Sequence, residues 1–130
     1  MDPTNVIFVG ARDIDPEEEE LINRAGARII PAGAVASDAL AQAVEDRKVW
    51  IHIDWDVLEP GYVSADYKVP GGLLPQQLRA SLQALPQKQV LGLELAEYQA
   101  SVDPAEREAE IATILNIVEP LFTEVSVAAI

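Results

Sequence analysis

Apolar residues along the chain gather in short runs that end at glycine, proline or charged residues. Runs of this kind are typical of strands that a sheet buries on both faces. The run VIFVG, for example, is closed by Gly10, and the most strongly patterned run contains IHIDWD. The pattern predicts strands at Val6–Gly10, Arg28–Pro31, Lys48–Asp56 and Gln89–Glu97, and it offers Glu124–Ile130 as a fifth candidate.

The segments between these runs contain capping residues and apolar spacings that predict helices. Asp15 and Asp103 each precede a proline, so each can cap a helix whose first position suits proline. The first of these helices is expected to end at about Gly26, which suits a left-handed C-terminal cap. Further helices are predicted at Ser37–Arg47 and Pro75–Leu85, and the helix after Asp103 should place Ile111, Ile114, Leu115 and Val118 on one face.

The alternation of strands and helices predicts an α/β fold with a mainly parallel sheet of about five strands. With 130 residues, 49% of them hydrophobic, the chain suits a single domain over residues 1–130. Functional groups in such a domain are expected at the carboxyl ends of the strands.

Charge and cysteine content narrow the classes of function. The net charge of −13 disfavours nucleic acids and anionic membranes as partners, and it favours metal cations or a substrate with an amine or guanidinium group. No cysteine is present, which excludes disulfides and thiolate chemistry. The first residues lack a signal-peptide pattern, so a cytoplasmic location is expected.

The segment from Ile51 to Asp56 brings candidate metal ligands together. Because strand side chains alternate, His52, Asp54 and Asp56 share one face, and the two carboxylates lie about 7 Å apart. Two anions at the end of an apolar strand favour either a proton or a cation between them. Carboxylates suit Mg, Ca or Mn, and an imidazole adds affinity for Mn, Fe or Zn.

A structural role is the alternative for the same residues. Asp56 and Glu59 can simply begin the turn required by Pro60 and Gly61, while Asp54 binds a neighbouring helix terminus. His52 can hydrogen-bond a carbonyl or a carboxylate such as Asp54, and this role is favoured because a single histidine within a sheet is usually structural.

Longer sequence motifs are more specific evidence of function than the spacing of Asp54 and Asp56. The segment HIDWDVLEPGYVSA, with VPGGL after it, resembles the third signature of the ureohydrolases, the arginase and agmatinase family. GARD at residues 10–13 resembles the family's G-x-R-D turn, and GLELAE at residues 92–97 resembles its G-[LM]-D-x-x-E strand. The motifs follow in the family's order across nearly the whole chain.

The resemblance implies a three-layer α/β/α fold, present here as an arginase-like half-domain. It also implies two manganese ions that activate a bridging hydroxide to attack the guanidinium carbon of a small substrate. By motif match, Asp54 and Asp56 are metal ligands, and Glu97 stands at the catalytic position that holds the guanidinium group. Two metals can clamp and deprotonate one water, and a carboxylate is a natural guanidinium partner. From position alone, Glu97 is equally a charge at the rim of its strand.

The chain departs from the family in its missing ligands. The family's other ligands come from an upstream histidine and a D-x-H-x-D run, whereas this sequence has one histidine and no such run. His52 stands where the family usually has a small hydroxyl residue. Two aspartates cannot complete the coordination of two metals, so we expect a ureohydrolase-like domain that is inactive or incomplete alone.

Two other interpretations stay open. The chain can be a subunit of a metal-dependent hydrolase that a second copy or a complementary chain completes, or it can be a non-catalytic module that binds a basic partner. Loss of half a sheet leaves an open edge and an apolar face. Association with a second copy or a complementary chain is therefore expected both for the incomplete domain and for the hydrolase subunit.

Overall fold

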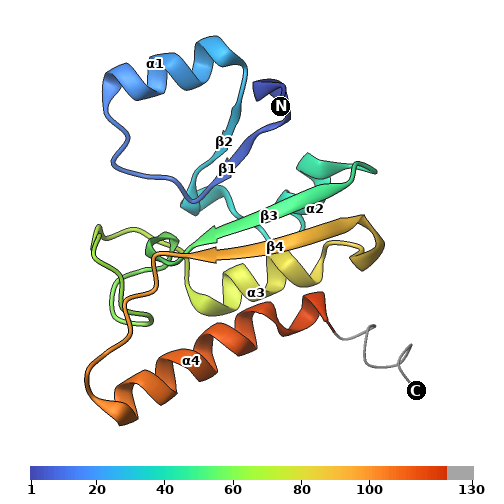
Figure 1. Ribbon diagram of the computed structural model, residues 1–130. Coiled ribbons are helices and arrows are strands. Elements are labelled where there is room, and N and C mark those ends of the chain that lie inside the picture. Colours follow the sequence, from blue (N-terminus) through green and yellow to red (C-terminus); the bar gives the residue numbers. More distant parts are fainter. Residues whose placement is uncertain (123–130) are drawn as a thin grey trace.

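The computed structural model describes residues 1–122, so the fifth predicted strand, Glu124–Ile130, lies outside the described residues. Within the described part, strands and helices alternate as the sequence predicts, with short 3-10 turns between several of them (Figure 1). The elements are β1 (Ile7–Val9), α1 (Pro16–Ala25), β2 (Arg28–Ile30), α2 (Ala39–Val44), β3 (Val49–Asp54), α3 (Pro75–Gln83), β4 (Val90–Ala96) and α4 (Pro104–Val118). The α/β class is confirmed.

Helix boundaries follow the capping residues closely. The Asp15 carboxylate accepts hydrogen bonds from the N–H groups of Glu17 and Glu18, at 3.1 and 3.2 Å, and Gly26 ends α1 with a φ of 76°. The helix α2 is shorter than predicted, because Glu45 adopts a φ of 59° directly after Val44 and turns the chain out of the helix.

The strands pair in two separate parallel sheets. β1 pairs with β2, and β3 pairs with β4 in a register that sets His52 opposite Glu94 and Asp54 opposite Ala96. Parallel pairing is as expected, whereas a single sheet of about five strands is not formed by the residues that the structure describes. In Figure 1 the four strands fan out from their carboxyl ends in the order β2, β1, β3, β4.

Both sheets pack on one hydrophobic core. Its largest fully buried side chains are Trp55, Leu73, Leu82 and Ile117, and half-buried Ile7, Val9 and Ile51 pack against it.

The buried face of α4 differs from the predicted one. Ile114, Ile117 and Val118 are buried, whereas Ile111 and Leu115 are exposed. The helix packs against α3 along one narrow stripe, and no described element covers the rest of its apolar surface.

Candidate metal and substrate site

Arg12 joins the carboxyl ends of β1 and β3. Its guanidinium donates hydrogen bonds to the carbonyl oxygens of Asp56 (2.8 Å), Leu58 (3.1 Å) and Val69 (2.6 Å). Nearby, the α-carbon of Gly10 lies so close to Val57 that a Cβ there would be 2.9 Å from a methyl group. The turn after β1 is thereby fixed against the turn that carries the aspartates.

Asp54 and Asp56 lie next to each other at this edge. Asp54 ends β3, and its carboxylate accepts a weak hydrogen bond from the Asp56 N–H at 3.4 Å, while Asp56 sits in the 3-10 turn that follows. Burial raises the pKa of Asp56, and the neighbouring Asp54 carboxylate raises it further, although the Arg12 guanidinium acts in the opposite direction. A cation between the two carboxylates would relieve this repulsion.

The two carboxylates suit a hard divalent cation, but they do not make a complete site. Oxygen ligands fit manganese or magnesium, and the raised pKa of Asp56 is the sign expected of an anion that lacks its counter-charge. Within residues 1–122, no group of three or more His, Asp or Glu side chains is placed to hold one metal. Further ligands are therefore needed for tight binding.

Glu97 follows β4 at the same edge of the molecule. Glu97 is exposed. Its backbone has a φ of 62°, a left-handed conformation that is uncommon for a residue with a side chain. The negative charge of Glu97 contributes to the raised pKa of Asp56, which places the two carboxylates in one electrostatic neighbourhood. Local backbone strain of this kind is concentrated at functional sites.

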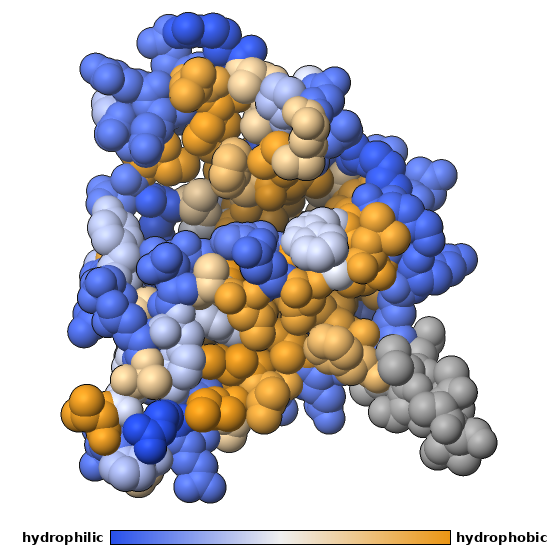
Figure 2. All heavy atoms as spheres, viewed as in Figure 1, coloured by the Kyte–Doolittle hydropathy of each residue, from blue (hydrophilic) through white to orange (hydrophobic). Residues whose placement is uncertain are grey.

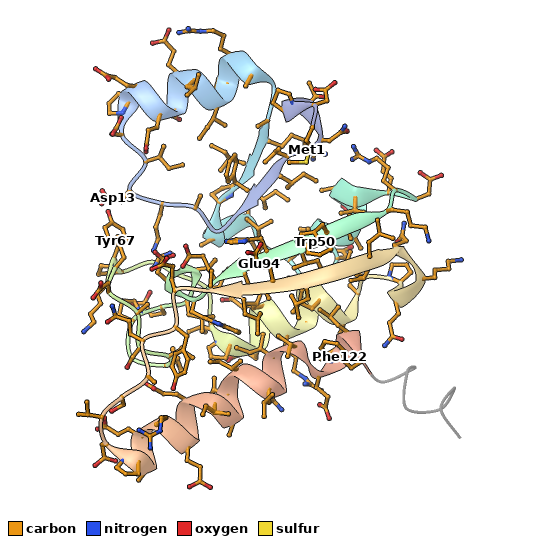
Figure 3. All side chains as sticks on the ribbon, in the orientation of Figure 1. Met1, Asp13, Trp50, Tyr67, Glu94 and Phe122 are labelled. Atoms are coloured by element: carbon orange, nitrogen blue, oxygen red, sulfur yellow. The ribbon has the colours of Figure 1, made fainter. Side chains whose placement is uncertain are left out.

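His52 lies apart from the aspartates on an exposed sheet face. Its Nδ1 is 3.0 Å from the Glu94 carboxylate on the neighbouring strand, so its carboxylate partner is Glu94 and not Asp54. Figure 3 shows Glu94 and Trp50 projecting from this sheet. As a metal ligand His52 remains a prediction, and the observed pairing agrees with the structural role.

The loop after Asp56 is built around Glu59. The Glu59 carboxylate accepts hydrogen bonds from the N–H groups of Gly71 and Gly72, at 2.7 and 2.8 Å, and so closes the loop beneath the site. This explains in physical terms why an acidic residue and a glycine pair occur together in the motif. The Asp56 side of the loop borders a cavity of about 250 Å³, which Tyr67 and Lys68 also line.

Asp13 is a residue of this edge that the sequence did not single out. It follows Arg12 with a φ of 54° and accepts a hydrogen bond from the Tyr67 hydroxyl, which reaches it from the loop below (Figure 3). Its place in the GARD motif, in the turn after the first predicted strand, is the signal that could have identified it.

Comparison with known proteins agrees with this geometry. The arginase family model matches residues 1–119, and the chain therefore belongs to the arginase family. An N(omega)-hydroxy-L-arginine amidinohydrolase from Streptomyces lavendulae is 51% identical over 120 residues, which cover 92% of this chain and 44% of that protein. A formimidoylglutamase from Halobacterium salinarum is 32% identical over 96 residues, covering 67% of this chain and 31% of that protein.

Solved structures show the same fold. The crystal structure of arginase from Bacillus subtilis superposes with a TM-score of 0.76 at 21% identity, over 93% of this chain and 46% of that one. The chain thus spans less than half the length of the relatives it matches. No helix within the described residues is long and apolar enough to cross a membrane.

Proposed function

We propose that this chain supplies the carboxyl-terminal half of a metal-dependent hydrolase site for a small guanidino substrate, and that it is inactive or nearly so alone. The observation that carries the proposal is the pair Asp54 and Asp56 at the end of β3, in a family motif, with the pKa of Asp56 raised by burial and by Asp54. Oligomerisation or a complementary chain would complete the site.

Each residue has a defined role in this proposal. Asp54 and Asp56 would hold manganese, which, when bound, supplies a Lewis acid and a water of lowered pKa. Glu97, which lies in the electrostatic neighbourhood of Asp56, would accept hydrogen bonds from the substrate guanidinium. Arg12 would keep the turn with Asp56 in place through the main chain, without touching metal or substrate.

The substrate class is suggested by the Streptomyces lavendulae relative. That protein is an N(omega)-hydroxy-L-arginine amidinohydrolase and shares 51% identity with this chain. The hydroxylated guanidino group is therefore the first substrate to test, with L-arginine and agmatine beside it. A carboxylate such as Glu97 pairs with the guanidinium part that all three compounds share.

Calorimetric titration of Mn²⁺ into metal-stripped protein tests the site. We expect weak binding that the double variant Asp54→Asn, Asp56→Asn abolishes, because the two carboxylates supply the charge but no third ligand completes the site within residues 1–122. The matched control is Asp38→Asn, Asp46→Asn, which removes the same charge from exposed positions elsewhere. Equal binding by wild type and by the Asp54, Asp56 variant would refute the metal role.

A non-catalytic interaction module is the second candidate. It is favoured by the lack, within the described residues, of any cluster of three potential metal ligands. If Mn²⁺ leaves the melting temperature unchanged, and a basic partner is bound equally well by the Asp54→Asn, Asp56→Asn variant, the module replaces the hydrolase as the function.

A further inference from the structure

Four exposed basic residues lie at the amino ends of three strands. They are Arg28 at the start of β2, Arg47 and Lys48 just before β3, and Lys88 just before β4, and we call them the basic cluster. In Figure 1 the amino ends of β3 and β4 lie side by side at the right, at the far end of β3 from Asp54. Figure 2 shows hydrophilic residues over this end of the sheet, whereas apolar residues cover the middle of the same face.

Hydrogen bonds to main-chain oxygens bring the basic cluster together. Arg47 donates to the Ala43 carbonyl at 2.7 Å, and Arg28 donates to the same oxygen at 3.4 Å. Lys48, the next residue after Arg47, donates to the Lys88 carbonyl on the neighbouring turn. One oxygen therefore holds two guanidinium groups side by side, and a second pair of basic residues adjoins them.

The positive charges of the basic cluster lack carboxylate partners. No ion pair within residues 1–122 includes a member of the cluster. Glu45 and Asp46 lie in the same turn, but two carboxylates leave the four cations in excess. This local excess contrasts with the net charge of −13 of the whole chain. Like charges that share one acceptor repel each other, and an anion between them would relieve that repulsion.

Helix capping explains only part of this arrangement. A cation is favourable at the carboxyl end of a helix, and Arg47 also donates to the carbonyl of Val44, the last residue of α2, at 3.0 Å. Arg28, however, reaches from another strand to an oxygen that Arg47 already binds. Lys48 bonds to the turn before β4 and not to α2. Capping therefore accounts for Arg47 alone.

Buried residues fix the frame that carries the basic cluster. Ala43 and Val44, whose carbonyl oxygens accept from the guanidinium groups, are both 3% exposed. Gln89 is 6% exposed, and its side-chain amide donates to the Glu45 carbonyl at 2.7 Å, which joins the turn before β4 to the turn before β3. An anion that binds at such an edge has few main-chain segments to order.

We propose that the basic cluster binds a phosphate dianion, either free or at the end of a small molecule. A guanidinium has five N–H donors in a planar fork, and the observed contacts use one nitrogen of Arg28 and two of Arg47. The remaining donors suit phosphate oxygens, which such a fork can bind through two parallel bonds. A dianion also balances the local excess of positive charge better than a single carboxylate does.

Titration of inorganic phosphate into the isotope-labelled full chain, at slightly alkaline pH, tests the site by NMR. Sodium chloride at matched ionic strength is the reference, because salt alone screens charge. We expect saturable shifts of the Nε–Hε signals of Arg28 and Arg47 and of the Lys48 and Lys88 amides, with half-saturation below about 10 mM. Phosphoserine should shift the same signals, and the tighter of the two compounds identifies the ester or the free ion as the better ligand.

Charge variants separate the basic cluster from the charge of the whole chain. The double variant Arg28→Gln, Arg47→Gln should weaken phosphate binding by about tenfold or more, because it removes both forks. The matched control is Arg24→Gln, Lys68→Gln, which removes the same charge from exposed positions elsewhere. It should change the affinity by less than about twofold, since exposed distant charges are screened.

A second double variant guards against loss of the fold. Arg47 caps α2, so its substitution can disturb that end of the domain. Lys48→Gln, Lys88→Gln keeps both arginines and should weaken phosphate binding by about threefold or more. Circular dichroism of each variant is compared with the wild type, and affinities are compared among the variants whose spectra match it.

Three results would overturn the phosphate site: shifts that sodium chloride reproduces, cluster variants that bind as tightly as the wild type, or a control variant that loses as much affinity as they do. A peptide of residues 15–25, with its four consecutive glutamates, that displaces phosphate and binds more tightly would instead assign the cluster to an acidic protein segment. None of these readouts involves Mn²⁺ or hydrolysis, so they are independent of the proposed function.

Discussion

At the scale of single residues, Arg12 concentrates many hydrogen bonds in one side chain. Its guanidinium donates to main-chain oxygens on both sides of the turn that carries Asp56, and it binds Val69 through two nitrogens, at 2.9 and 2.6 Å. Lysine cannot reproduce this fork, because its ammonium is a single point of donation. The carbonyl oxygens would then lose partners in a half-buried position.

We therefore expect Arg12→Lys to lower the free energy of unfolding by about 1–3 kcal/mol, measured by urea denaturation. The control is Arg24→Lys, because Arg24 forms a well-exposed pair with Glu20 on α1. Exposed pairs of this kind contribute about 0–1 kcal/mol. Equal losses in the two variants would show that the Arg12 contacts do not stabilise the turn.

Gly72 is the second residue whose geometry allows a sharp prediction. A Cβ added there would lie 2.4 Å from the Glu59 nitrogen and from the Leu58 carbonyl carbon, both of them backbone atoms that cannot move aside easily. Gly72→Ala should cost about 2–4 kcal/mol in chemical denaturation. Gly33→Ala is the control, since an added Cβ meets nothing within 4 Å, and it should be neutral or slightly stabilising. A stable Gly72→Ala protein would contradict the observed closeness.

At the scale of elements, Glu110 ties α4 to the loops around the site. Its carboxylate accepts hydrogen bonds from the Ser64 N–H at 3.1 Å and from the Tyr98 hydroxyl at 2.9 Å. Burial raises the pKa of Glu110, but the hydrogen bonds from Ser64 and Tyr98 outweigh it, and the pKa falls below its ordinary value of 4.5. The ionised form is therefore the one that stabilises the fold.

A lowered pKa in the folded state means that the ionised carboxylate of Glu110 increases the free energy of unfolding. The contribution of Glu110 is complete above pH 4.5, its ordinary value, and is lost as the pH falls through the lower folded value. Glu110→Gln should cost about 1–2 kcal/mol at pH 7, and the difference from wild type should shrink below pH 4.5. Glu108→Gln, two positions earlier on an exposed part of α4, should change little at either pH. A constant difference across this range would argue against an ionised clamp.

At the scale of the whole molecule, the net negative charge destabilises the folded state. Nine Lys and Arg residues face 22 Asp and Glu residues, and the resulting net charge of −13 makes the folded state repel itself. Salt screens this repulsion. Raising the NaCl concentration from about 10 to 300 mM should therefore raise the melting temperature by about 2–5 °C.

The acidic start of α1 provides the control for the salt effect. Glu19→Lys removes two units of negative charge in an exposed position, so it should raise the melting temperature at low salt and reduce the effect of added salt. A melting temperature that falls with salt in the wild type would mean that local ion pairs outweigh the net repulsion.

The sequence by itself determined much of the local structure of this protein and pointed to its family. Asp15 and Gly26 define α1 because capping satisfies the N–H and C=O groups that a helix end leaves free, and this chemistry is local. The motif at Asp54 and Asp56 likewise pointed to the family that the comparison confirmed. These features depend on neighbours in the chain, so a pattern of residues is enough to predict them.

Only the tertiary structure decided which distant groups meet. The pairing of His52 with Glu94, the Arg12 contacts with the turn after Asp56, and the exposure of Ile111 and Leu115 all depend on strand register and on which faces find a partner. The division of the strands into two sheets is of the same kind. Sequence periodicity predicts that a strand forms, but a strand's neighbour is set by packing across the whole molecule, and β1 and β3 each leave one edge without a neighbour among the described residues.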